Sequence, residues 1–226
     1  MGHCEFQKGQ RVGLGDHHIY CVGIICLIGF LMGVIIAFET ALVAQIFGAV
    51  IFVVNGIGIA MTRELGPLMT AILFAGRSGS AFAAQLGTQK VNEELNALTT
   101  FGLSPMYFLV VPRLIASSLV VPLLSVFATI LGILGGGLVM AMYDITYTQF
   151  YVQLLKSVTV TDIVFGLVKA VIFGFVIALI GCQCGMNTGA GAAAVGSSTT
   201  KSVVKSIIWI VVIDGAAALL TNRLGI

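Results

Sequence analysis

Long apolar runs divide this chain into segments of membrane-spanning length. Between Ile19 and Thr62 the only charged residue is Glu39, and as a single helix this run would be about 66 Å long, over twice the roughly 30 Å core of a bilayer. The run must therefore fold back on itself. We place a first span near residues 20–43, a turn near 45–48, and a second span from about residue 50 to residue 75 or beyond.

The remaining apolar runs predict three further spans. The clearest of them has no charged residue, begins after Arg113 and ends at Asp144. The fourth span is interrupted by Lys169, and the fifth has Asp214 inside it. We place these spans at residues 114–143, 163–184 and 203–220, so the expected fold is all-α with about five transmembrane helices.

Two connecting segments are expected to be loops. Residues 144–162 are mixed in character, and their tyrosines suit a membrane interface. Residues 186–200 (MNTGAGAAAVGSSTT) are uncharged, but they hold too few large side chains for a convincing span. Residues 1–18 are polar and glycine-rich, so we divide the chain into an N-terminal tail, 1–18, and one transmembrane domain, 19–226.

A short amphipathic helix is predicted between the second and third spans. Val91, Leu95 and Leu98 stand at positions i, i+4 and i+7 of one helical face, and mostly charged or amide side chains lie between them. Gly102 can adopt the left-handed conformation that ends a helix, and Pro105 prevents its continuation. The segment is too short and polar to cross a membrane, so it either connects two spans or docks a soluble partner.

The composition agrees with an integral membrane protein. Hydrophobic residues make up 58% of the chain and charged residues 9%, whereas a soluble domain is about a quarter charged. The net charge of +2 gives no indication of nucleic-acid binding. Cys182 and Cys184 lack a second pair at zinc spacing, and the five cysteines form an odd set, so neither a metal site nor a disulfide framework is predicted.

The basic residues predict the orientation of the chain. Cytoplasmic loops carry an excess of Lys and Arg, and this excess is obtained here with the N-terminus in the cytoplasm. Only Lys156 and Arg223 then fall on the outer side. The cytoplasmic side holds Lys8, Arg11, Arg77, Lys90, Arg113, Lys201 and Lys205.

Arg63, Glu64, Lys169 and Asp214 are ionisable residues that fall within the predicted spans. A charge at the bilayer centre costs about 2.5–3.5 kcal/mol, so these groups should face protein or a wet cavity. One interpretation is an interhelical salt bridge, for example between Glu64 and Lys169. The other is a polar lining for a lipid headgroup, with Arg63 and Lys169 suited to phosphate. The two interpretations can coexist.

The second span is expected to be kinked or locally opened after these charges. Pro67 removes a backbone hydrogen bond, and Gly66 permits close approach of another helix. Small residues four positions apart also recur at Gly29/Gly33, Gly132/Gly136 and Gly181/Gly185, a spacing that lets helix backbones approach closely in lipid. These pairs suit packing within the chain at least as well as dimerisation.

Enzymatic readings find little support in the sequence. Residues 76–79 (GRSG) superficially resemble the motif of intramembrane serine proteases, but all three histidines precede the first span, so none can serve as the base. Neither an H-E-x-x-H zinc motif nor a phosphate-binding G-x-x-x-x-G-K-[ST] loop is present. We therefore expect no enzymatic activity, no resident cofactor and no ATP hydrolysis by this chain alone.

One long segment carries a family resemblance. Residues 63–116 (RELGPLMTAILFAGRSGSAFAAQLGTQKVNEELNALTTFGLSPMYFLVVPRLIA) contain, in order, R-E-L-G-P, A-G-R-x-G-S, an acidic amphipathic segment and P-R. This pattern closely resembles the core signature of the MlaE/YrbE-type permeases, the membrane subunits of ABC transporters that work with MCE-domain proteins. Weaker similarity extends over nearly the whole chain, including Lys169 and Asp214.

The resemblance implies a homodimeric permease of the bacterial inner membrane. Phospholipid would pass through a cavity between the two copies toward an MCE-domain protein, driven by an ABC ATPase subunit that binds ATP and Mg²⁺. Arg63, Glu64 and Lys169 would line or gate the cavity, and we group Glu39 with them; Asp214 is a further buried acid. The segment around Lys90–Thr99 would be the cytoplasmic coupling helix. Its assigned ATPase-coupling residues are Lys90, Glu93, Glu94, Leu95 and Leu98.

Two alternatives stay open. A proton-coupled secondary transporter would use Glu64 or Asp214 as its titrating carboxylate, because intramembrane acids also mark such pathways. A purely structural assembly subunit would need no cavity. The energy source distinguishes the first alternative from an ATP-driven permease.

Overall fold

The fold is seen in a computed structural model that describes residues 2–102 and 104–224. Its described residues form helices and short connections, with no strand among them. Five segments are long and apolar enough to cross a membrane, which confirms the expected all-α, five-span fold. These segments are Val22–Ile46, Ile51–Val91, Met106–Ala141, Val160–Met186 and Ala192–Thr221.

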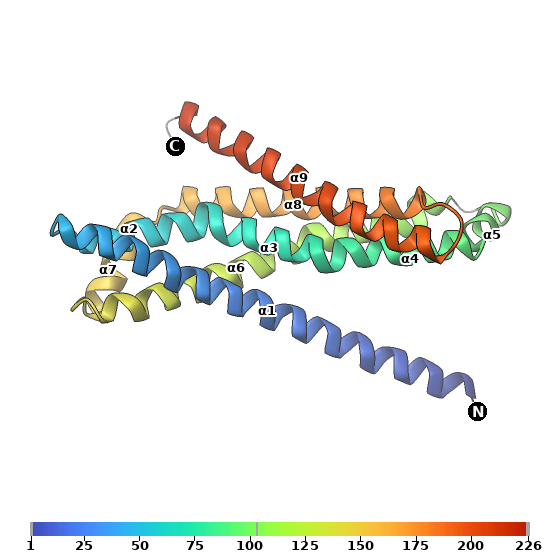
Figure 1. Cartoon of the computed structure of the whole chain (residues 1–226), viewed down its shortest axis with the longest axis horizontal. Helices are drawn as coiled ribbons and strands as arrows, with labels where there is room; N and C mark the ends of the chain where they lie inside the picture. The colour runs from blue at the N-terminus through green and yellow to red at the C-terminus, as the bar shows by residue number, and fades with distance from the viewer. Residues whose placement is uncertain (1, 103, 225–226) are drawn as a thin grey trace.

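The spans run back and forth along one long axis (Figure 1). The first is the membrane-length part of α1 (Gly2–Ile46). The second is continuous but changes its helical geometry, in the order α2 (Ile51–Ala60), η1 (Met61–Leu65), α3 (Gly66–Phe74), η2 (Ala75–Gly79) and α4 (Ser80–Val91). The others are η3 (Met106–Val110) with α6 (Val111–Ala141), then α8 (Val160–Met186), then α9 (Ala192–Leu224).

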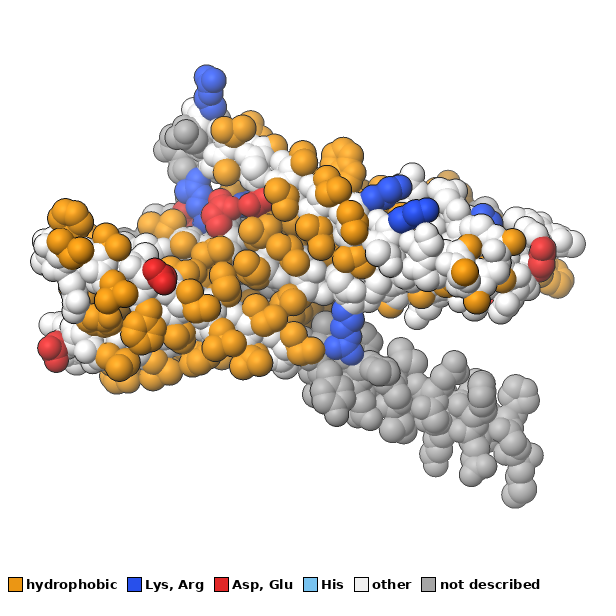
Figure 2. Space-filling model, in the orientation of Figure 1, with side chains coloured by type: hydrophobic (Ala, Val, Ile, Leu, Met, Phe, Trp, Pro, Cys, Tyr) orange, Lys and Arg blue, Asp and Glu red, His pale blue; other side chains and the backbone are white. Residues whose placement is uncertain are grey.

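Two short helices lie at opposite ends of the bundle. Helix α5 (Glu94–Thr100) is at the end where α9 begins, and α7 (Tyr147–Ser157) is at the end where α1 turns into α2 (Figure 1). Large apolar side chains are exposed along the sides of the spans, and Figure 2 shows them covering much of one face. An apolar surface of this kind matches hydrocarbon rather than water.

Glycine allows the spans to pack at backbone distance. A Cβ at Gly33 of α1 would overlap the carbonyl of Gly132 in α6, and one at Gly29 would meet the Ala128 carbonyl at 2.6 Å. A Cβ at Gly185 in α8 would lie 2.7 Å from Leu86 of α4. The small-residue pairs are therefore used in packing within the chain.

Two predicted loops were partly wrong. Residues 144–162 contain α7, whose start is fixed by a capping box between Thr146 and Gln149. Residues 186–200 are expected to form a loop because they hold few large side chains, yet α9 already begins at Ala192. Alanine has the highest intrinsic helix propensity, so a run of small residues continues the fifth span toward the end of the bundle.

The predicted amphipathic helix is shorter than expected. Lys90 and Val91 belong to the end of α4, and Glu93 has a left-handed backbone (φ 62°) that separates α4 from α5. The second span accordingly reaches Val91 and is 41 residues long. Gly102 has φ 77°, which confirms its predicted left-handed conformation after the helix.

Candidate functional site

A buried lysine joins three spans. Lys169 in α8 is 2% exposed, and its Nζ lies 2.5 Å from Glu64 Oε2 in η1 and 2.9 Å from Asp214 Oδ1 in α9. The predicted bridge between Glu64 and Lys169 is therefore present, and Asp214 from α9 is a second partner. We call Lys169, Glu64 and Asp214 the ion triad.

The members of the ion triad differ in their access to the surroundings. The Glu64 side chain is 33% exposed and that of Asp214 is 19% exposed, whereas Lys169 is almost completely covered. A lysine ammonium has three donors, and two of them are used by the carboxylates. With one cation and two anions the triad carries an excess of negative charge in its fully ionised form, and Glu64 is the carboxylate best placed to exchange for a ligand.

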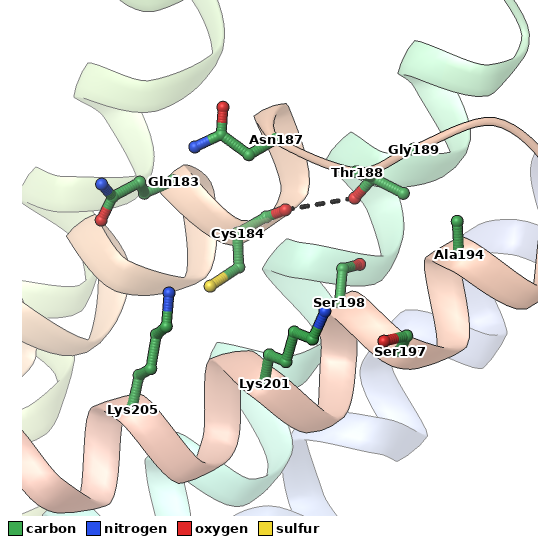
Figure 3. Close-up of a pocket in the computed structure, with 10 residues that line it drawn as sticks. All are labelled: Gln183, Cys184, Asn187, Thr188, Gly189, Ala194, Ser197, Ser198, Lys201 and Lys205. Carbon is green, nitrogen blue, oxygen red and sulfur yellow. Dashed lines mark hydrogen bonds between the residues drawn. The ribbon is translucent and has the colours of Figure 1, made fainter.

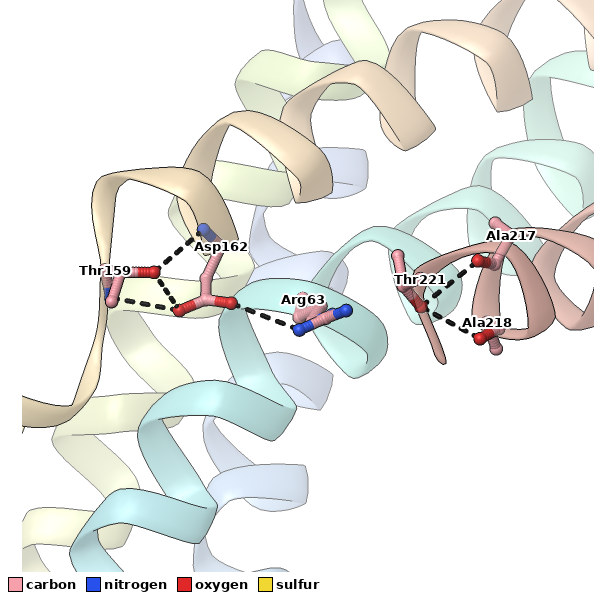
Figure 4. Close-up of polar contacts among 6 residues, drawn as sticks. All are labelled: Arg63, Thr159, Asp162, Ala217, Ala218 and Thr221. Carbon is pink, nitrogen blue, oxygen red and sulfur yellow. Dashed lines mark hydrogen bonds and ion pairs between the residues drawn. The ribbon is translucent and has the colours of Figure 1, made fainter. Parts of the chain in front are cut away.

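A second ion pair lies beside the triad. Arg63 Nη1 is 3.4 Å from Asp162 Oδ1, and Asp162 also accepts hydrogen bonds from the backbone N–H and hydroxyl of Thr159 (Figure 4). Thr159 is the N-cap of α8 and forms a capping box with Asp162. Arg63 is thus tied to the start of α8, while its neighbour Glu64 reaches the interior of the same helix.

Phe165 lies between the Arg63–Asp162 pair and the ion triad, and it contacts a cation of each. The Arg63 guanidinium and the Lys169 ammonium each lie 5.3 Å from the centre of its ring. Cations over an aromatic face within about 6 Å are attracted by the ring quadrupole. Asp162, Phe165 and Lys169 are spaced so that they share one face of α8, and this face meets η1.

A π-helical turn presents Arg63 and Glu64. In η1 (Met61–Leu65), the Gly66 N–H bonds to the Met61 carbonyl five residues back, and Thr129 of α6 donates to the same carbonyl over 3.3 Å. A Cβ at Gly166 of α8 would overlap the Thr62 carbonyl, so glycine is needed for this contact. The local departure from α-helical geometry lies directly before Gly66 and Pro67, the residues predicted to kink the span.

An apolar cavity of about 270 Å³ adjoins the π-helical turn. Thr62 and Pro67 line it together with residues of α6, α7 and α8. Ile130, Ile133, Leu155 and Ile163 give it mainly hydrocarbon walls. A polar cluster and an apolar recess therefore meet at the same turn.

The other predicted site residues are not part of the ion triad. Glu39 lies exposed on α1, and within the described residues no hydrogen bond or ion pair joins it to the triad. Lys90 donates to the Met186 carbonyl at the end of α8 over 2.7 Å. Glu93, Glu94 and Leu98 are exposed or half-buried at the end of the bundle. Among the described residues, no His, Cys, Asp and Glu side chains converge in a metal-sized group.

Sequence reasoning missed two members of this region, Asp162 and Phe165. Asp162 was assigned to a loop, and its partner Arg63 is 99 positions away. A local signal existed, because T-x-x-D before an apolar run is a capping pattern that marks the start of a helix. No comparable signal identifies Phe165, since an aromatic residue in an apolar span is commonplace.

Comparison with known proteins gives concordant matches. The family model described as Permease MlaE matches residues 16–220. A probable ABC transporter permease protein of Rickettsia typhi is 34% identical over 205 residues, covering 90% of this chain and 78% of the relative. A probable ABC transporter permease protein of Synechocystis is 38% identical over 180 residues, covering 79% and 68%. The Arabidopsis thaliana protein named TRIGALACTOSYLDIACYLGLYCEROL 1, chloroplastic, is 38% identical over 159 residues, covering 70% and 45%.

Proposed function

Because this chain belongs to the MlaE permease family of ABC transporters, we propose that it moves phospholipid between the bacterial inner membrane and an MCE-domain partner. An ABC permease works with a separate ATPase subunit, which binds and hydrolyses ATP with Mg²⁺. We further propose that the chain acts as a homodimer with its N-terminus in the cytoplasm. A lipid cargo is in keeping with the Arabidopsis relative, whose name contains that of a galactolipid.

The observation that carries the lipid proposal is the meeting of ions and hydrocarbon at η1. A phospholipid presents a phosphate next to two acyl chains, and it therefore needs a cationic group beside an apolar surface. Lys169 and Arg63 supply the cations, and the 270 Å³ cavity lined by Thr62 and Pro67 supplies the apolar surface. Glu39 is exposed on α1 and lines neither this cavity nor the ion triad, so in this proposal it would face the larger cavity between the two copies.

The ion triad suggests how a phosphate is held and released. Glu64 is the most exposed of the three partners, so an incoming phosphate would replace Glu64 at Lys169 while Asp214 keeps its contact. One anion then substitutes for another, and the buried ammonium is never left without a counter-ion. The exchange is thus close to balanced, and a modest movement of η1 would tip it toward binding or release.

ATP-driven movement would enter through α5. This helix projects at one end of the bundle, and its described side chains are all exposed or half-buried. The second span connects α5 to η1 through α4, η2 and α3, so a movement of α5 can reach η1 along one continuous segment. We propose that the ATPase grips α5, with Lys90, Glu93, Glu94, Leu95 and Leu98 at the contact.

Phosphate exchange predicts opposite effects for two substitutions in the triad. Glu64→Gln removes the competing carboxylate charge and should raise the amount of phospholipid that co-purifies with the protein. Lys169→Met removes the cation and should lower it. Native mass spectrometry of the protein extracted from membranes measures bound phospholipid directly.

Matched controls lie outside the site. Asp144→Asn and Lys156→Met make the corresponding chemical changes at exposed positions just before α7 and within it, and both should retain the wild-type lipid content. Equal lipid content in wild type, E64Q and K169M would contradict the exchange and leave the triad with a structural role alone.

A proton-coupled carrier remains a second candidate because the triad has two carboxylates for one ammonium. A proton on Glu64 would neutralise the excess charge. Transport by reconstituted vesicles separates the two candidates. Transport driven by a proton gradient without ATP supports the carrier, and transport that requires ATP and the ATPase supports the permease.

A further inference from the structure

A second cavity lies apart from the ion triad, between the end of α8 and the first half of α9. Its volume is about 430 Å³, within the range of about 300–1,000 Å³ common for ligand pockets. Figure 3 shows the side chains of α9 reaching toward the last turn of α8 and the connection that follows it. Neither Glu64, Lys169 nor Asp214 lines this cavity.

Two lysines give this cavity its charge. Lys201 and Lys205 both line it, and they stand one helical turn apart on α9. Neither ammonium has an ion pair or hydrogen bond to any described residue. Like charges at positions i and i+4 repel each other, and no Asp or Glu is among the lining residues to relieve that repulsion.

Neutral donors complete the lining. The side chains of Gln183, Asn187 and Ser197 face the cavity without a hydrogen bond to the described part of the chain. The hydroxyls of Thr188 and Ser198 are already used, because they donate to backbone carbonyls within α8 and α9. The recess therefore combines two free ammonium groups with amide and hydroxyl donors, a set suited to a phosphate-type anion.

The depth of the lysines indicates where such an anion comes from. At 1.5 Å per residue, Lys201 and Lys205 lie about 14 and 20 Å along α9 from its start at Ala192. Beyond them the exposed side chains of α9 are apolar, including Ile208, Trp209 and Val212. The lysines thus stand at the boundary between polar and hydrocarbon-facing surface, the level at which a lipid headgroup lies.

We infer that this cavity is a binding site for a phosphate group, which is supplied by the headgroup of an anionic phospholipid in the leaflet on the α5 side. Lys201 and Lys205 bind the phosphate charge, and Gln183, Asn187 and Ser197 donate to its oxygens. The site is separate from the proposed transport site, and its existence does not depend on which cargo the protein carries.

The single tryptophan of the chain provides a clean probe of this site. Trp209 is 54% exposed and follows Lys205 by one helical turn, so it shares the lysine face of α9. The full chain is reconstituted in phosphatidylcholine nanodiscs that contain about a fifth phosphatidylglycerol. In one sample the phosphatidylglycerol is brominated on its acyl chains, and in another an equal amount of the phosphatidylcholine is brominated. Quenching of Trp209 fluorescence then reports which lipid lies beside it.

Selective occupancy predicts stronger quenching by brominated phosphatidylglycerol than by brominated phosphatidylcholine at the same mole fraction. Lys201→Gln with Lys205→Gln should reduce this preference by up to about 25-fold, because each lysine near an anionic surface contributes on the order of fivefold. Lys201→Arg with Lys205→Arg should retain it. Lys156→Gln, at the opposite end of the bundle, is the matched control and should also retain it, and circular dichroism checks that every variant stays helical.

A soluble source of the anion gives a different result. Inorganic phosphate is added to phosphatidylcholine nanodiscs at constant ionic strength, with chloride as the comparison. A Trp209 emission change that needs phosphate and both lysines, without a preference for phosphatidylglycerol, assigns the site to free phosphate. If the double glutamine variant keeps the phosphatidylglycerol preference, or if wild type responds to neither probe, the inferred site is wrong.

Discussion

Lys169 connects η1, α8 and α9 through its two ion pairs. Replacing it by methionine leaves Glu64 and Asp214 facing each other without their shared cation. Breaking a buried ion pair by removing one partner costs about 3–5 kcal/mol, whereas replacing all partners by neutral groups costs far less. We expect K169M to lower the unfolding free energy by about 3 kcal/mol and the triple variant E64Q/K169M/D214N to recover most of it.

Unfolding in a titration with sodium dodecyl sulfate, followed by circular dichroism, measures these differences. Lys156→Met is the surface control, since Lys156 is exposed on α7. If K169M and the triple variant lose equal stability, the missing side-chain packing of Lys169, rather than its charge, is responsible.

At this scale the sequence predicted part of the site. An ionised residue inside an apolar span must have a partner, and this requirement correctly paired Glu64 with Lys169. It could not identify the partner of Arg63, because Asp162 stands outside the predicted fourth span and the pairing depends on how η1 packs against α8. Which of two acids lies nearer to a lysine is a matter of tertiary geometry, which spacing along the chain does not encode.

Helices α1 and α6 pack so closely that they leave no room for an added methyl group at Gly33. A Cβ at Gly33 would overlap the Gly132 carbonyl, whereas one at Gly23 of the same helix meets no atom within 4 Å. Gly33→Ala should therefore force the helices apart and cost about 1–3 kcal/mol. Gly23→Ala should be neutral or stabilise the helix by up to about 1 kcal/mol.

The same detergent titration compares the two alanine variants. Their difference isolates the close approach of the helices, because both changes add the same methyl group to α1. Equal stability of G33A and G23A would show that α1 and α6 do not pack at the Gly33 position.

The proposed docking of the ATPase on α5 can be tested by charge reversal. If α5 is the element that the ATPase grips, reversing the charge of two exposed acids, Glu93→Lys with Glu94→Lys, should reduce co-purification of the ATPase severalfold. The bundle itself should be unaffected, because no residue of α5 is buried. Wild-type amounts of ATPase in the pull-down of the double variant would move the docking site elsewhere.

The hydropathy pattern predicted the membrane spans but missed some of the other helical segments. The five spans follow from apolar runs that exceed a bilayer thickness, so their number was predictable. Helix α7 and the first turns of α9 were missed because they are short, polar or poor in large side chains. Their signals were a capping box at Thr146 and an alanine run from Ala192, which report helix formation rather than burial.

For the whole molecule, the family assignment and the geometry support each other at different levels. Membership of the MlaE permeases establishes an ABC transporter subunit in a membrane. The ion triad beside an apolar cavity supports the proposal that a phosphate and an acyl chain bind there. We propose that ATP-driven movement of η1 exchanges Glu64 for a lipid phosphate at Lys169.

ATP-dependent phospholipid transfer by the reconstituted transporter tests this claim most directly. The permease is purified with its ATPase, placed in vesicles that contain a fluorescent phospholipid, and assayed for transfer to an added acceptor with and without ATP. We predict transfer that requires ATP in the wild type and falls at least about tenfold in K169M, with ATPase binding unchanged. Transfer without ATP on a proton gradient, or K169M transfer equal to that of the wild type, would contradict the claim.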